Sequence, residues 1–178
     1  MKKLSKYIII GLLVGICITA THVLFLEPLI RRLSLVQNNN VEFDMVVSKV
    51  ENELRMRGLQ FDSAEVYLTE MVDFPSAVGI TYTIPIEIGF TKSWIEIKKG
   101  YFNDSSDEIR EALILHEYGH YLGANHDSAM RKFRQYSYFS GYESCPATVM
   151  HPTDSLMGCF NSHRQYYYDD LVKRVLEK

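Results

Sequence analysis

The sequence predicts an α+β domain with three strands between two helices and a further helix at the C-terminus. The chain has 178 residues, of which 47% are hydrophobic, and this is enough for one hydrophobic core. A segment with helical periodicity is followed by three segments that alternate like strands, and a second helical pattern comes after them. Helices and strands that follow one another in this way are typical of the α+β class.

The first half of the predicted domain contains one helix and three strands. Apolar residues recur at three- and four-residue spacing over 41–57, and Gly58 provides a helix stop. Strand-like alternation then appears in 65–71, 78–84 and 94–101.

The second half contains the long helix and a terminal helix. Ser105 and Glu108 have the spacing of a capping box, so we expect a helix to start there and to continue to His120. We expect the chain after Gly123 to be irregular until Asn161 or Ser162, either of which would cap a last helix.

The charge distribution separates the N-terminus from the rest of the chain. The net charge is −3, but residues 1–39 carry five basic side chains against Glu27, and the remainder has 14 basic and 21 acidic side chains. This acidic balance argues against a nucleic-acid partner. The composition also excludes disordered, collagen-like and coiled-coil chains.

The N-terminal segment 7–26 contains no charged residue and follows Lys2, Lys3 and Lys6. Twenty helical residues are long enough to cross a bilayer, so we expect a signal anchor, with a cleaved signal peptide as the alternative. The lysines favour a cytoplasmic N-terminus and an exported C-terminal part. The predicted organisation is an anchor or signal peptide over 1–27, a linker over 28–40 and one domain over 41–178. The chain would then be a single-pass membrane protein, or secreted if the anchor is removed.

The most informative segment contains three histidines. His116 and His120 are four residues apart on the predicted helix, so both imidazoles can bind one zinc ion. Gly123 allows the chain to turn sharply, and His126 can then bring a third nitrogen to the same ion. The open fourth position of such a zinc site activates water, and Glu117 can take up the proton as the general base.

This pattern, HExxHxxGxxH, resembles the signature of the metzincin clan of zinc endopeptidases, in which a methionine-containing turn lies beneath the metal. The segment 145–152 is similar to the methionine turn of matrix metalloproteinases and makes Met150 the expected methionine. Met157 in 155–158 is the competing candidate.

The resemblance implies a zinc-dependent endopeptidase with a metzincin-like zincin domain. In such a domain a mixed, twisted sheet lies over the active-site helix, and a small C-terminal subdomain contains the methionine turn and the terminal helix. Asp127 follows the third histidine as in adamalysins, which implies that its carboxylate supports the turn carrying His126. Cys145 and Cys159 can be free buried thiols or a disulfide, and similarity to small secreted metzincins of the snapalysin type favours the disulfide. The expected partner is a protein or peptide in extended conformation, paired with strand 78–84 or 94–101.

Two other interpretations remain open. The first is an HExxH peptidase of the gluzincin or SprT-like type, which takes its third ligand from Glu143 or His151. The second is a membrane-tethered binding protein without catalytic activity, in which a fourth protein ligand closes a structural zinc site.

Overall fold

The structure is a computed structural model, and it describes residues 40–70, 72, 76–87, 90–126, 132–137, 141–151 and 159–178. These residues belong to a compact unit, 37–178, which is separate from 1–36. The predicted anchor, nearly all of the linker, Asp127 and Met157 lie outside the described residues. Among the residues described, no helix has the length and apolarity needed to span a bilayer.

The first described helix, α3 (Val41–Met56), lies where the sequence predicts it. The side chain of Asn40 accepts a hydrogen bond from the amide of Phe43, at 3.1 Å, and so caps the first turn. Phe43, Val50 and Leu54 are buried and form the inner face of the helix.

The sheet has three strands in the order β1-β3-β2. Strand β1 (Glu65–Thr69) is parallel to β3 (Phe90–Lys98), whereas β2 (Gly79–Glu87) is antiparallel to β3. The predicted α+β class and the mixed sheet are therefore confirmed. Because β3 is central, β2 forms an edge of this sheet.

The prediction of a strand over 94–101 is wrong at its C-terminal end. The chain leaves β3 at Lys98 and forms a short helix, α4 (Lys99–Asp104), whose Phe102 is fully buried. Arg110 donates to the carbonyl of Phe102 at 2.7 Å and to that of Asn103 at 3.0 Å. These bonds satisfy carbonyls at the end of α4, and the sequence pattern gives no indication of them.

The predicted helix start at Ser105 is also wrong. The Ser105 hydroxyl donates to the carbonyl of Tyr101 at 2.6 Å, so Ser105 ends α4 instead of capping the next helix. The long helix α5 (Asp107–Tyr121) begins one residue later than a Ser105 cap requires, after Ser106.

Two strands occupy part of the region that we expected to be irregular. Strands β4 (Lys132–Ser137) and β5 (Gly141–Pro146) pair as an antiparallel hairpin. The last helix, α6 (Phe160–Leu176), starts after Cys159 and not at Asn161 or Ser162. The Ser162 hydroxyl donates back to the Cys159 carbonyl at 3.2 Å, and His163 has non-helical backbone angles, so α6 is kinked near its start.

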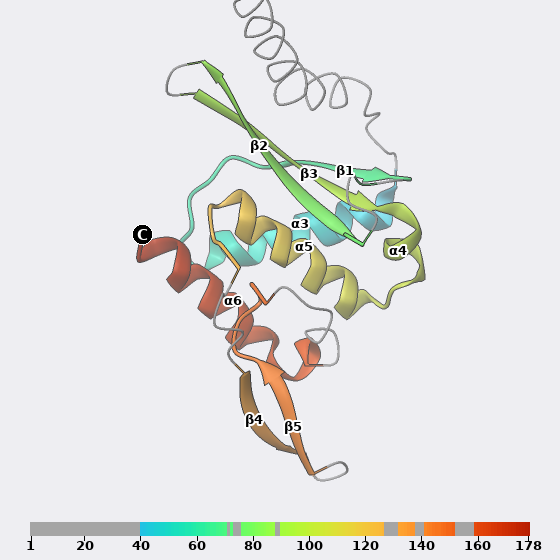
Figure 1. Ribbon diagram of the computed structural model, residues 1–178, viewed down its shortest axis with the longest axis vertical. Helices are drawn as coiled ribbons and strands as arrows, with labels where there is room; N and C mark the ends of the chain where they lie inside the picture. Colours follow the sequence, from blue (N-terminus) through green and yellow to red (C-terminus); the bar gives the residue numbers. More distant parts are fainter. Residues whose placement is uncertain are drawn as a thin grey trace, which may run out of the picture. The chain divides into compact units, whose positions relative to one another are not determined.

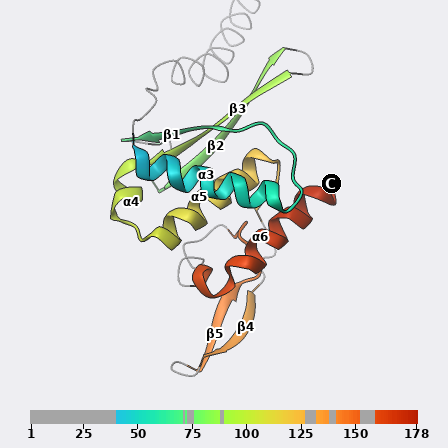
Figure 2. The same cartoon turned by 180° about the vertical axis from the view of Figure 1, so that it is seen from behind.

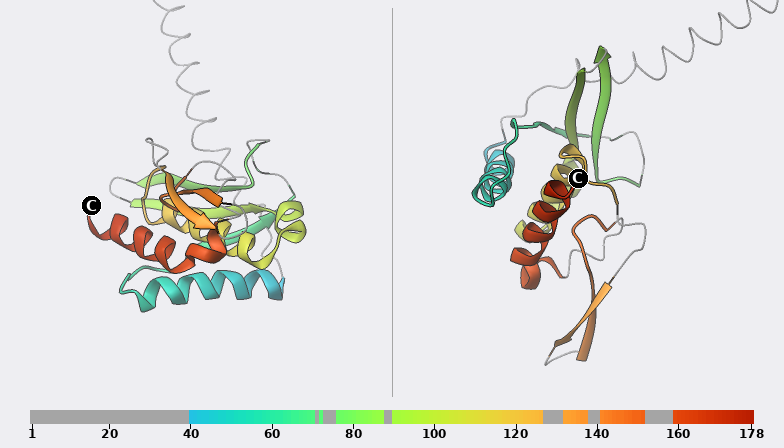
Figure 3. Two further views of the ribbon diagram at one scale, coloured as in Figure 1. Left: turned by 90° about the horizontal axis from the view of Figure 1, so that it is seen from below. Right: turned by 90° about the vertical axis from the view of Figure 1, so that its left-hand side faces the viewer.

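Helix α5 lies between the sheet and the other long helices (Figures 1 and 3). It packs on β2 and β3 on one side and on α3 and α6 on the other. Figure 2 shows the opposite side, where α3 lies in front of α5. Ile95 and Ile97 of the sheet, Leu115 of α5 and Leu171 of α6 are fully buried in the resulting core. Because α5 packs against other elements on both sides, its backbone is held in place by the core.

A buried carboxylate connects the three long helices. Glu111 of α5 accepts from Lys49 of α3 at 2.6 Å, from Arg164 of α6 at 2.6 Å and from the hydroxyl of Tyr168 at 2.8 Å. Both carboxylate oxygens therefore have charged partners, which offsets the cost of burying the charge.

Candidate metal centre

Three imidazoles converge at the C-terminal end of α5. The Nε2 atom of His126 lies 3.1 Å from Nε2 of His116 and 3.1 Å from Nε2 of His120. Within the described part of the chain, these three side chains form the group with the spacing needed to hold a metal ion. The structure therefore brings together the three histidines that the sequence singles out.

Backbone carbonyls orient the two helical histidines. The Nδ1 atom of His116 lies 2.7 Å from the carbonyl oxygen of Val149, and Nδ1 of His120 lies 3.0 Å from that of Ala124. A carbonyl oxygen can only accept, so each Nδ1 must carry a hydrogen. In the neutral rings, both Nε2 atoms then present lone pairs toward His126, as metal-binding histidines do.

The chain reaches His126 through a tight turn at the end of α5. Gly123 has a φ of 88°, which is the left-handed conformation that glycine adopts without strain. The amide of Gly123 donates to the carbonyl of His120 at 2.8 Å, and the amide of Ala124 donates to that of Gly119 at 2.7 Å. This pair of bonds is a Schellman motif, and it reverses the chain within three residues of His126.

The histidine cluster fits a zinc ion by its donor chemistry and spacing. The Nε2 atoms of His116 and His120 both hold lone pairs. A neutral His126 has at most one hydrogen on Nε2, so it can donate a hydrogen bond to only one of them. A cation placed between the rings would satisfy all three. Tetrahedral bonds from zinc to nitrogen of about 2.0–2.1 Å place the nitrogens about 3.3 Å apart. The separations of 3.1 Å are close to this value.

The surroundings keep these histidines neutral. Burial lowers the pKa of His116 to about 4, and it also lowers the pKa of His120, with a further contribution from His126. Burial lowers the pKa of His126 as well. Neutral rings are the form that binds a metal, so the cluster is ready for one at neutral pH.

Glu117 lies beside the histidines, with its side chain buried in the protein. The hydroxyl of Thr81 in β2 is 2.8 Å from Glu117 Oε2. Burial raises the pKa of Glu117 to about 7, and the hydrogen bond from Thr81 partly opposes this shift. A carboxyl group with such a pKa can both take up and release a proton near neutrality.

Met150 packs against the helix that carries the site, at Gly119. A Cβ atom built on Gly119 would be 2.2 Å from Met150 Sδ, so only glycine allows this approach. Met150 is fully buried, and its amide donates to the Thr148 hydroxyl at 3.1 Å. The segment that contains Met150 also supplies the Val149 carbonyl that orients His116.

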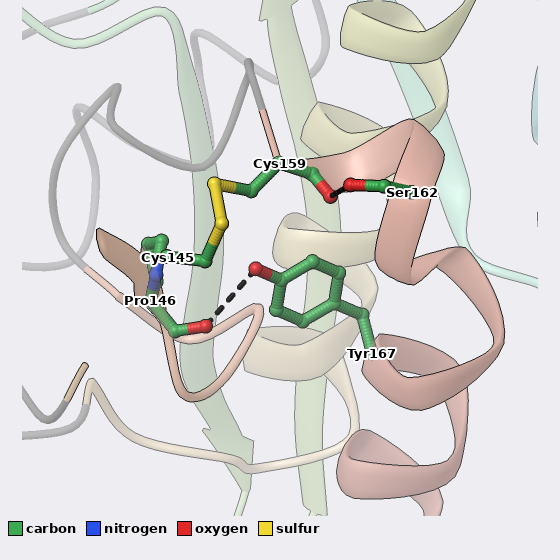
Figure 4. The surroundings of a disulfide bond; sticks show 5 residues. All are labelled: Cys145, Pro146, Cys159, Ser162 and Tyr167. Carbon is green, nitrogen blue, oxygen red and sulfur yellow. Dashed lines mark hydrogen bonds between the residues drawn. A yellow bond between two sulfur atoms is a disulfide. The ribbon is translucent and has the colours of Figure 1, made fainter. Parts of the chain in front are cut away.

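Helix α6 holds this segment in place. A disulfide joins Cys145 to Cys159, with the Cα atoms 5.7 Å apart, and the Tyr167 hydroxyl donates to the Pro146 carbonyl at 3.0 Å (Figure 4). The Tyr166 hydroxyl donates to the Ala147 carbonyl at 2.8 Å. The disulfide and both tyrosines thus fix the chain that leads to Met150.

The site opens into a pocket of about 500 Å³ between β2 and α5. The three histidines and Glu117 line it from the helix and the following turn, and residues 79–81 and Thr83 line it from β2. His151 is buried at the same pocket, whereas Asp127 lies outside the described residues.

Sequence reasoning missed three residues that shape the site: Gly79, Thr81 and Gly119. Gly79 and Thr81 are two positions apart on a strand, and nothing in their spacing relates them to a helix 36 residues away. Gly119 lies inside the histidine motif in the last turn of α5, and a glycine within a helical pattern is a signal of close packing.

Comparison of the chain with protein-family models, with curated proteins and with solved structures finds no match. The function must therefore be inferred from the chemistry of the site.

Proposed function

We propose that this protein is a zinc-dependent endopeptidase. The observation that carries the proposal is the convergence of three histidine side chains beside the buried carboxyl group of Glu117. The pocket that contains them is lined on one side by the edge strand β2. The resemblance of the motif to the metzincin signature supports the same assignment, with Met150 as the methionine of the turn.

Each residue of the site has a defined role in this proposal. His116, His120 and His126 would hold the ion, whose chemistry when bound is to polarise the scissile carbonyl and to make water acidic. Glu117 takes the proton from the attacking water and later gives it to the departing amine. The carbonyls of Val149 and Ala124 keep the helical imidazoles in the orientation that this arrangement needs.

The proposed substrate is a protein or peptide in extended conformation. Strand β2 is at an edge of the sheet, and Gly79, Ile80, Thr81 and Thr83 line the pocket. An extended chain can add to such an edge by backbone hydrogen bonds. Between the two strands considered from the sequence, this position favours β2, because β3 has neighbours on both sides.

The apolar segment 7–26 completes the proposal. We assign to it the tethering of an exported catalytic domain to the membrane, because its twenty residues carry no charge and follow three lysines. Proteolysis would then act on proteins near the membrane surface.

The test uses the full-length protein, with zinc per chain and cleavage of unfolded casein as its two measurements. We expect about one zinc per chain and cleavage of casein by the wild type. Glu117→Ala should keep the zinc and lose nearly all activity, because it removes only the proton acceptor. His126→Ala should lose most of the zinc, and His163→Gln in α6 provides the control for loss of a histidine.

Two results would contradict the proposal in different ways. Equal casein cleavage by the wild type and Glu117→Ala would exclude this mechanism, and a structural zinc site would then explain bound metal. Full zinc occupancy in His126→Ala would point to another third ligand, as in the gluzincin or SprT-like interpretation.

A further inference from the structure

The edge strand β2 contacts the general base as well as the substrate pocket. Thr81 Oγ1 lies 2.8 Å from Glu117 Oε2 and 2.9 Å from the Glu117 carbonyl oxygen. Two positions earlier on the same strand, Gly79 faces the same carboxyl group. A Cβ atom at Gly79 would be 2.8 Å from Glu117 Oε1 and 2.9 Å from its Cγ.

We infer that Thr81 is a positioning residue for Glu117, and that the missing side chain at Gly79 leaves the space in which the carboxyl group is held. This inference rests on the proposed function, because it assigns to β2 the placement of the proton acceptor. The two residues bracket the carboxyl group: Thr81 binds one oxygen, and Gly79 lies against the other.

The hydroxyl of Thr81 suits both protonation states that the reaction requires. When Glu117 is ionised, the hydroxyl donates its hydrogen to Oε2. When Glu117 has taken the proton from water on its other oxygen, Oε2 is the carbonyl oxygen of the acid and still accepts the hydrogen of the hydroxyl. The carboxyl group thus keeps a partner before and after proton transfer, without movement of the strand.

Gly79 is required for its size and not for its conformation. Within the described part of the chain, the glycines with positive φ are Gly58 and Gly123, so the backbone at Gly79 accommodates alanine. A methyl group there would nevertheless overlap the carboxyl group of Glu117, and the end of that side chain would have to move. Gly79→Ala therefore displaces the proton acceptor, since the three atoms nearest to the new methyl group all belong to Glu117.

The first experiment measures kcat and KM of the zinc-loaded full-length protein on a fluorogenic peptide that contains a cleavage site identified in casein. We expect Thr81→Val, which has nearly the same shape, to lower kcat about tenfold, with KM and zinc per chain within twofold of the wild type. Thr81→Ser should restore kcat to within about threefold, because it keeps the hydroxyl. Gly79→Ala should lower kcat at least as much as Thr81→Val.

A matched control is Thr91→Val, which changes an exposed threonine of the neighbouring strand β3 and should leave both constants unchanged. Wild-type kcat in Thr81→Val would overturn the inference while the endopeptidase assignment stands. A wild type that cleaves no casein would instead contradict the proposed function itself.

The second experiment needs no catalytic activity. In the metal-free protein, Thr81→Val should lower the melting temperature more when Glu117 is present than in a Glu117→Ala background, because its lost partner is the carboxyl group. A threonine that acts only through its bond to the Glu117 carbonyl oxygen, which remains in Glu117→Ala, would cause the same shift in both backgrounds. Equal shifts would therefore overturn the inference, even if the activity of Thr81→Val is low.

Discussion

The sulfur atom of Met150 lies so close to Gly119 that a Cβ atom on this glycine would be 2.2 Å from it. The contact joins the turn that contains Met150 to the helix that carries His116 and His120. It also explains why glycine stands in the last turn of this helix, at a position where any side chain would overlap Met150.

We expect Gly119→Ala to destabilise the protein by about 1–3 kcal/mol despite its better helix propensity, because the methyl group overlaps Met150 Sδ and approaches Leu171. Urea unfolding measures the change. Gly100→Ala is the matched control, since nothing lies within 4 Å of a Cβ atom there. If Gly119→Ala is as stable as the wild type, the contact with Met150 is not as tight as described.

The raised pKa of Glu117 predicts a pH-dependent effect of Glu117→Gln in the metal-free protein. The pKa rises from 4.5 to about 7 on folding, so the neutral carboxyl group favours the folded state below pH 4.5. This contribution is lost as the pH rises through about 7. Relative to the wild type, Glu117→Gln should therefore be more stabilising at pH 8 than at pH 5, by about 2–3 kcal/mol.

Urea unfolding of both proteins at the two pH values, in the presence of a chelator, checks this prediction. Comparison of the two proteins cancels the contributions of the other titrating groups. An equal difference at pH 5 and pH 8 would show that Glu117 titrates normally in the fold.

The lowered pKa values of the histidines predict how acid releases zinc. Protons compete for a histidine only below its pKa, and burial lowers the pKa of His116 to about 4 and also lowers those of His120 and His126. Zinc should therefore be released only below the usual histidine pKa of 6.5, as the pH falls toward 4. Dialysis at each pH followed by metal analysis measures this, and loss of half the zinc already at pH 6.5 would contradict it.

Removal of the disulfide should loosen the segment that contains Met150. Cys145 and Cys159 close a loop with a sequence separation of 14, and a bond across such a loop contributes about 3 kcal/mol. We expect the double change to serine to lower the free energy of unfolding by about this amount. Cys17→Ser is the control, and a double variant with wild-type stability would show that Tyr166 and Tyr167 suffice to hold the segment.

The buried carboxylate of Glu111 should be sensitive to substitution. Glu111→Ala removes the buried acceptor of Arg164 and Tyr168, while Arg164 keeps Glu53 at 3.2 Å, so we expect a loss of about 1–3 kcal/mol. Glu177→Ala is the control, because its ion pair with Lys173 is exposed and such pairs contribute about 0–1 kcal/mol. Thermal and urea unfolding of the two variants should differ clearly.

Local patterns predicted the elements whose cause is local. The apolar spacing of 41–57 is enough to locate α3, because a surface helix repeats its buried positions every three to four residues. The same applies to Gly123, where the left-handed turn follows from the place of a glycine after a helix. Both depend on residues that are close in the sequence.

The errors occurred where distant residues decide the structure. Ser105 has the spacing of a helix cap, yet it ends α4, because the buried Phe102 and the side chain of Arg110 stabilise that short helix. Helix α6 starts after Cys159, which a disulfide joins to Cys145, and not at Asn161 or Ser162.

The amino-acid sequence on its own determined the chemistry available to this protein: three imidazoles and a carboxylate at spacings that one helix and one turn can bring together. The tertiary structure decided the surroundings of that chemistry. Val149 orients His116 from 33 residues away, and Thr81 holds Glu117 from 36 residues away. Such contacts form only when separate elements pack around one core, and no periodicity along the chain encodes which residues will meet.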